Sequence, residues 1–122
     1  PGQVTWYPFD ADGNLDDANV KEIGAAGMYN AELVAIPSGR FLLVWYELAP
    51  PSTCPIKGRL FDENVEPLGE PFTMYEPAQF HCGSSFDVAA NPIGDVALVW
   101  EESYQNAADG ARAMYFPGLI ED

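Results

Sequence analysis

The chain has 122 residues, of which 48% are hydrophobic and 13% aromatic, and 19 acidic against five basic residues give a formal net charge of −14. This length suits one domain with its own core, and the composition argues against a disordered chain. The negative charge disfavours nucleic acid and anionic lipid as partners, and no apolar run reaches the ~18 to 20 residues of a membrane span. Solubility explains such a charge most simply; cation binding or a saline habitat are the alternatives.

Short strands separated by turn residues are predicted along the whole chain. The turns are rich in Pro, Gly, Asn and Asp, which adopt the required backbone dihedrals, and no segment has the pattern of a long amphipathic helix. The sequence therefore predicts an all-β fold. In chain order the expected strands cover residues 4–9, 19–23, 31–36, 40–47, 56–61, 71–75, 85–90, 95–102 and 112–116.

The chain also repeats itself. Gly39 and Trp45 recur 55 residues later as Gly94 and Trp100, within the related stretches GRFLLVWYE and GDVALVWEE. Three phenylalanines mark equivalent points in a second block: Phe9, Phe61 and Phe116. We therefore expect a single domain over residues 1–122, with repeat segments 4–55 and 56–110 and the start of a third copy at 111–122.

The central strand of each repeat carries a continuous apolar run, at 41–46 and at 96–100, instead of an alternating pattern. Both faces of such a strand must be covered. The preceding strand has small residues, which suit a crowded position, and the strand at 56–61 is mixed, as in a more exposed position. This gradient fits a β-propeller blade. The expected core consists of Phe41, Leu43, Val44, Trp45, Val96, Leu98, Val99 and Trp100.

A motif of the type F-D-x-x-G/V-x-x-L/P-G, followed by V-A-x-x-x-x-G-x-x-x-L-V-W-x-E, spans almost the whole chain. It resembles the tandem propeller-type repeats of about 50 residues in secreted and surface-anchored bacterial proteins. The resemblance implies antiparallel four-stranded meander repeats, here two β-propeller-like blades in a shifted frame, and an extracellular or cell-surface location. It transfers no catalytic residue.

Two blades leave sheet faces and edges uncovered, and open apolar edges pair with other chains. The expected partners are further copies of the chain, closing a ring or growing a filament, with strand 4–9 or 112–116 completing a neighbour's blade. The alternatives are the rest of a longer chain, for which the opening Pro1-Gly2 is an indication, or two sheets closing on each other.

Cys54 and Cys82 fall on loops that strand reversals bring to one end of the meander, so we expect a disulfide between them; two inert buried thiols are the alternative. Four further residues, on the long loops at the same end of the meander, make a candidate binding surface for a sugar or a protein. They are Tyr29, Phe80, His81 and Tyr104. Ordinary packing over the blade ends is the simpler interpretation.

Alternating oxygen-bearing side chains at Asp10, Asp12, Asn14 and Asp16 are typical of Ca²⁺ ligands in a short loop. The glycine is wrongly placed for an EF-hand, and a hairpin turn is the simpler interpretation. A zinc site at His81 would compete with the disulfide. No catalytic pair or phosphate-binding motif is present.

The sequence therefore predicts a non-enzymatic extracellular β-repeat protein with a structural or adhesive role that self-associates through an exchanged terminal strand and needs no cofactor. A ligand-binding module for carbohydrate or Ca²⁺, using the loop end with the cysteines, is the alternative.

Overall fold

A computed structural model describes residues 4–24, 27–36, 39–47, 54–76, 86–102 and 110–119. It confirms the all-β prediction, because these residues form antiparallel strands and no α-helix. Among them no helix has the length and apolar character needed to cross a membrane. The elements are β1 (Thr5–Trp6), the 3-10 turn η1 (Asp17–Asn19), β2 (Lys21–Glu22), β3 (Met28–Ala35), β4 (Phe41–Glu47), β5 (Ile56–Phe61), β6 (Phe72–Tyr75), β7 (Phe86–Ala90), β8 (Val96–Glu102) and β9 (Gly110–Phe116).

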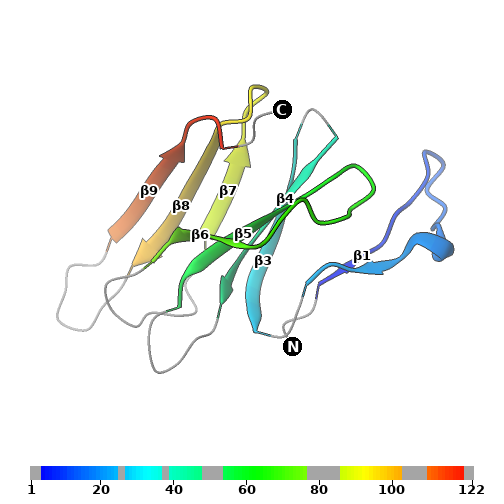
Figure 1. The fold of residues 1–122 in the computed structure, drawn as a ribbon, viewed down its shortest axis with the longest axis horizontal. Helices are drawn as coiled ribbons and strands as arrows, with labels where there is room; N and C mark the ends of the chain where they lie inside the picture. Colours follow the sequence, from blue (N-terminus) through cyan, green and yellow to red (C-terminus); the bar gives the residue numbers. More distant parts are fainter. Residues whose placement is uncertain are drawn as a thin grey trace.

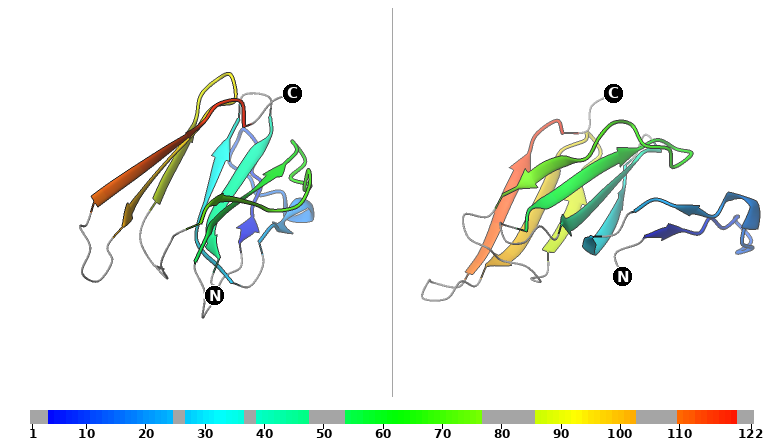
Figure 2. Two further views of the ribbon diagram at one scale, coloured as in Figure 1. Left: turned by 60° about the vertical axis from the view of Figure 1, so that its left-hand side comes forward. Right: turned by 60° about the horizontal axis from the view of Figure 1, so that its bottom comes forward.

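The strands form three sheets that stand side by side (Figure 1). A two-stranded sheet pairs β1 with β2, a four-stranded middle sheet has the order β3-β4-β5-β6, and a three-stranded sheet has the order β7-β8-β9. Each sheet follows the chain order, so every connection within a sheet is a hairpin. Neighbouring sheets pack against each other through shared cores, and the described strands do not close into a ring (Figure 2).

Three hairpin turns, at 10–14, 62–66 and 91–95, share one hydrogen-bond pattern. In each, the first residue's N–H donates to the fifth residue's carbonyl and the fourth residue's N–H donates back to the first carbonyl. The first side chain, Asp or Asn, accepts from the third and fifth backbone N–H groups. The fourth residue has positive φ and is glycine in two turns, but Val65 in the other, with φ 60°.

Strand β4 of the middle sheet is buried on both faces. Leu43, Trp45 and Phe61 point toward β1–β2, and the ring centroids of Trp6 and Phe41 lie 5.1 Å apart in a tilted arrangement. Leu42 and Val44 share the opposite core with residues of the β7–β9 sheet. Strand β4 therefore carries its apolar run because it lies between two sheets, as its sequence predicted.

Strand β8 differs from this prediction. Val96, Leu98 and Trp100 are buried against the middle sheet, but Val99 is 45% exposed and Ala97 is also exposed. The alternation of a strand places Ala97 and Val99 on the side away from the middle sheet, where no other sheet lies among the described residues. Including Val99 in the core was wrong for this reason.

Candidate functional site

A cleft of about 540 Å³ opens between the β1–β2 hairpin and the middle sheet. Its wall combines charged side chains with apolar ones, and it holds two of the five basic residues of the protein. The lining consists of Lys21, Glu22, Ile23, Gly24, Met28, Arg59, Phe61, Val65, Glu66 and Pro67.

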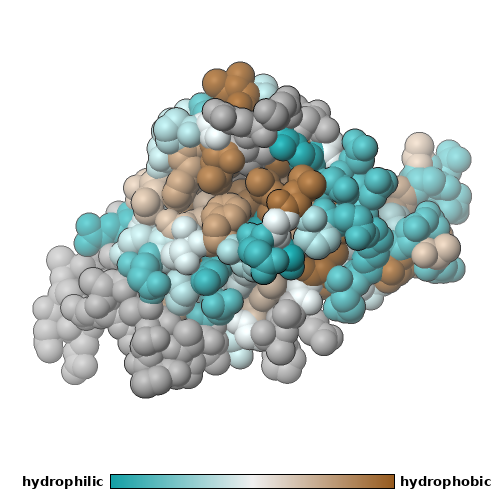
Figure 3. Space-filling view, viewed as in Figure 1, coloured by the Kyte–Doolittle hydropathy of each residue, from teal (hydrophilic) through white to brown (hydrophobic). Residues whose placement is uncertain are grey.

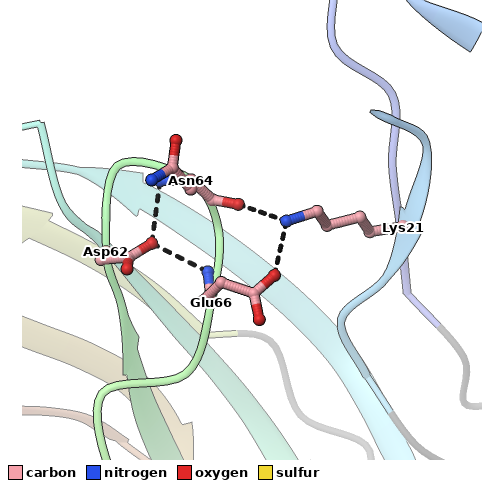
Figure 4. A network of polar contacts seen from close by, with 4 residues as sticks. All are labelled: Lys21, Asp62, Asn64 and Glu66. Atoms are coloured by element: carbon pink, nitrogen blue, oxygen red, sulfur yellow. Dashed lines mark hydrogen bonds and ion pairs between the residues drawn. The ribbon is translucent and has the colours of Figure 1, made fainter. Parts of the chain in front are cut away.

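Lys21 ties the hairpin to the middle sheet across this cleft (Figure 4). Its Nζ donates to the carbonyl oxygen of Asn64 and forms an ion pair with Glu66 Oε2 at 2.6 Å. Both partners lie in the turn that Asp62 holds by accepting the N–H groups of Asn64 and Glu66. Lys21 of the β1–β2 sheet therefore binds a turn of the middle sheet whose conformation Asp62 stabilises.

Arg59 is also occupied by protein groups. Its Nε donates to the carbonyl of Gly69 at 2.9 Å, and its Nη2 lies 3.8 Å from a carboxylate oxygen of Glu70. Because both cations of the cleft have carboxylate neighbours, the cleft offers no uncompensated positive charge to an anion. It suits a neutral ligand with hydroxyl groups better.

The four predicted Ca²⁺ ligands are exposed and lie between β1 and β2. The right-hand end of the molecule in Figure 3 is largely hydrophilic. Asp10 Oδ1 accepts the N–H groups of Asp12 and Asn14, and Asp16 Oδ2 accepts from Asn19 Nδ2. The hydrogen bond from the backbone N–H of Asn14 is the main reason that the pKa of Asp10 is lowered. Nowhere in the described chain do three His, Cys, Asp or Glu side chains gather to hold a metal.

The predicted binding surface is described only in part. The sequence predicts a loop position for Tyr29, and this is wrong. Tyr29 lies within β3 opposite Tyr46, because the strand begins at Met28 and continues through an irregularity after Tyr29. Phe80, His81 and Tyr104 lie outside the described residues.

Cys54 is 1% exposed and precedes β5 at the end of the middle sheet where β6 finishes. No free cysteine occurs in the part of the chain that is described. Cys82 lies outside it, so the bridge stays a prediction.

A polar cluster that the sequence did not single out links the turn before β8 to the end of β9. Asp95 accepts hydrogen bonds from Tyr115 Oη and from the N–H of Gly118, and Asn91 Nδ2 donates to it at 3.1 Å. The Tyr115 bond is the main reason that the pKa of Asp95 lies below its usual value and that the pKa of Tyr115 lies above its own. The turn motif at 91–95 is the one sequence signal for this cluster.

The inner strands β3 and β7 contact each other, and each carries a carboxylate, Glu32 on β3 and Asp87 on β7. Burial, and then the negative charge of Asp87, raise the pKa of Glu32. These residues lie 55 apart, the spacing that separates Gly39 from Gly94. Sequence comparison within the chain would have paired them.

Strand β9 forms the outer edge of its sheet and pairs only with β8 among the described strands. Its seven residues, GARAMYF, contain one arginine and no acidic residue. Met114 and Tyr115 on it are exposed.

In comparisons with known proteins, no family model matches the chain, and no curated protein or solved structure matches it.

Proposed function

We propose that this protein is a non-enzymatic, extracellular β-repeat protein with a structural or adhesive role that self-associates through its terminal strands. In this proposal the three sheets are successive propeller-type blades in a shifted frame. β1–β2 is the outer half of one blade, β3–β6 is a whole blade, and β7–β9 lacks its outermost strand.

The observation that carries the proposal is the outer edge of β9, which pairs with no other strand among the described residues. An edge strand exposes a row of backbone N–H and C=O groups, and soluble proteins usually protect such an edge with charges, proline or a bulge. Over seven residues β9 has one charge, no proline and an unbroken register with β8. The outer edge of β9 is therefore suited to pair with a strand of another chain.

The distribution of charge supports the same proposal. The chain carries −14 overall, so two copies repel each other over most of their surfaces. Residues 110–116 and residues 4–9 contain no acidic side chain. Contact through these two segments brings the copies together where this repulsion is weakest.

An extracellular location is supported by the cysteines. Cys54 is buried and no free cysteine is found in the described segments. A disulfide to Cys82 would persist in an oxidising compartment and not in a reducing one.

Two proline variants test the role of the β9 edge. Backbone N–H groups of adjacent strand residues point to opposite edges of the strand. Of the variants Ala113→Pro and Met114→Pro, one therefore loses a hydrogen bond to β8. The other, the free-edge variant, loses only an N–H donor on the outer edge. We expect the free-edge variant to keep its melting temperature and to lose self-association in light scattering. A folded free-edge variant with the native mass of the unmodified protein would refute the proposal.

A second candidate function is ligand binding in the cleft beside Lys21. The apolar wall and paired polar groups favour a neutral, hydroxyl-bearing ligand such as a carbohydrate. Chemical-shift changes at Lys21 and Phe61 on titration with an oligosaccharide mixture would support this function, and unchanged shifts would exclude it for the sugars used.

A further inference from the structure

We infer that Arg59 and Glu66 are the residues that recognise a neutral saccharide in the cleft between the β1–β2 hairpin and the middle sheet. Arg59 donates hydrogen bonds to neighbouring hydroxyl oxygens of the sugar, and Glu66 accepts a hydrogen bond from one of its hydroxyl groups. This inference rests on the second candidate function, ligand binding in the cleft, and names the residues that would make it selective.

Two contacts hold the guanidinium of Arg59 in one orientation. Its Nε donates to the carbonyl oxygen of Gly69 at 2.9 Å, and its Cζ lies 6.0 Å from the centroid of the Phe61 ring. Gly69 has a φ of 132°, which residues with a side chain rarely adopt, so a glycine is needed to present its carbonyl in this way. Because the group is already fixed, binding a ligand costs little further side-chain entropy.

The Nη atoms of Arg59 keep their N–H donors for a ligand. The hydrogen bond to Gly69 uses only the Nε donor. A carboxylate oxygen of Glu70 lies 3.8 Å from Nη2, which is beyond hydrogen-bond distance, and the Glu70 side chain is 93% exposed. No acceptor within the described segments hydrogen-bonds to either Nη atom. A planar fork of donors is therefore available at the wall of the cleft.

Glu66 supplies an acceptor in the same cleft. Its Oε2 accepts a hydrogen bond from Lys21 Nζ at 2.6 Å, which holds the carboxylate in place (Figure 4). Its other oxygen, Oε1, has no hydrogen-bond partner in the part of the chain that is described. A hydroxyl group both donates and accepts, so a ligand with several hydroxyl groups can satisfy Arg59 and Glu66 together.

The character of the cleft favours a neutral saccharide over an anion or a peptide. Three of its apolar lining residues, Ile23, Phe61 and Val65, are buried, so little apolar surface is offered to the side chains of a peptide. The carboxylates of Glu66 and Glu70 beside the cations, and the net charge of −14, disfavour an anion. The volume of about 540 Å³ lies within the range of ligand pockets, roughly 300 to 1,000 Å³.

Substitution of Arg59 tests its role. NMR titration of the isotope-labelled chain with a mixture of neutral oligosaccharides should move the signals of Arg59 and Glu66. Arg59→Lys keeps the positive charge and loses the planar fork, so we expect it to weaken binding about tenfold or more. Lys57→Gln is the matched control, because Lys57 lies on the same strand, pairs with Glu47 at 3.6 Å and does not line the cleft. It should bind as the unmodified protein does.

A second pair of variants separates the acceptor from the ion pair. Glu66→Ala and Lys21→Ala both remove the contact between these two residues, but only Glu66→Ala also removes the carboxylate acceptor. We therefore expect Glu66→Ala to bind the oligosaccharides more weakly than Lys21→Ala does. Thermal melts of all four variants establish that they are folded at the temperature of the titration.

Each outcome of the titration has a distinct meaning. If Arg59→Lys binds the oligosaccharides as tightly as the unmodified protein, Arg59 does not recognise the ligand, while the cleft remains a ligand site. If a neutral glycine-serine peptide moves the cleft signals and the oligosaccharides do not, the class of ligand is wrong. If neither probe moves these signals, the inference fails together with the second candidate function.

Discussion

Phe9 and Phe61 hold the same place in successive hairpins, one residue before the aspartate that organises each turn, yet Phe61 is 2% exposed and Phe9 is 62% exposed. Phe61 packs under the β1–β2 sheet, with Trp45 and Val65 in the same cluster. For Phe9 no preceding sheet exists among the described residues. Exposure at equivalent positions thus reports whether a neighbouring sheet is present.

This difference predicts unequal costs for the same substitution. Phe61→Ala should lower the free energy of unfolding by about 3 to 5 kcal/mol, because it removes a buried ring and leaves a cavity. Phe9→Ala should change the stability of the isolated chain by less than about 0.5 kcal/mol. Urea denaturation of both variants at a concentration that keeps the chain monomeric measures the two costs, and equal losses would contradict the assigned packing.

Val65 adopts a left-handed conformation that its branched side chain disfavours, at a position where two equivalent turns have glycine. Its side chain is nevertheless buried with Ile23 and Phe61. Both Val65→Ala and Val65→Gly lose this packing, but only glycine relieves the strain. We expect Val65→Gly to be more stable than Val65→Ala by about 0.5 to 1 kcal/mol. The reverse order in chemical denaturation would show that the strain is negligible.

Glu32 predicts a pH dependence. Because burial and then Asp87 raise its pKa, the folded protein binds a proton here more readily than the unfolded chain. Stability from this group therefore falls as pH rises from the ordinary glutamate pKa through the raised one. Glu32→Gln should stabilise the protein at pH 7, by less than about 1 kcal/mol, and give no benefit in acid. Melting curves across pH measure this, with the exposed Glu63→Gln as control; a pH-independent difference would contradict it.

Asp95 predicts the opposite sign. Hydrogen bonds from Tyr115 and from the Gly118 N–H lower its pKa, so the stability it contributes is present above the ordinary aspartate pKa and is lost as pH falls through the lowered value. Asp95→Asn should melt at a lower temperature at pH 7, and the difference should shrink in acid. Tyr115→Phe should reproduce part of the loss. An Asp95→Asn variant as stable as the unmodified protein at pH 7 would rule out this role.

The predicted Cys54–Cys82 bridge has a direct chemical test. Thiol titration of the denatured, unreduced protein should find no reactive thiol, and prior reduction should expose both. Reduction should also lower the free energy of unfolding by about 3 to 4 kcal/mol, the value expected for closing a loop of this length. Two reactive thiols before reduction would refute the bridge.

Much of the fold could be predicted from local signals. The apolar run at 41–46 indicated a strand covered on both faces, and β4 has this burial. The turn residues separated strands at positions close to those observed. The exposure of Val99 could not be predicted in this way, because its surroundings depend on whether another sheet follows, and the run at 96–100 resembles the buried run at 41–46.

The candidate site was harder to predict than the fold. Lys21 and Glu66 are 45 residues apart and meet only because two sheets stack, so their pairing leaves no local pattern. The role of Asp10 was hard to predict for a different reason, because alternating carboxylates are typical both of a cation-binding loop and of a hairpin turn. Here the Asp10 oxygens accept the N–H groups of their own turn.

The native mass of the unmodified chain in solution tests self-association most directly. Light scattering at two protein concentrations, with the cysteines left as purified, should give a whole-number multiple of the 13.3 kDa chain mass. A mass of one chain at both concentrations would contradict the proposal that the protein self-associates through its terminal strands.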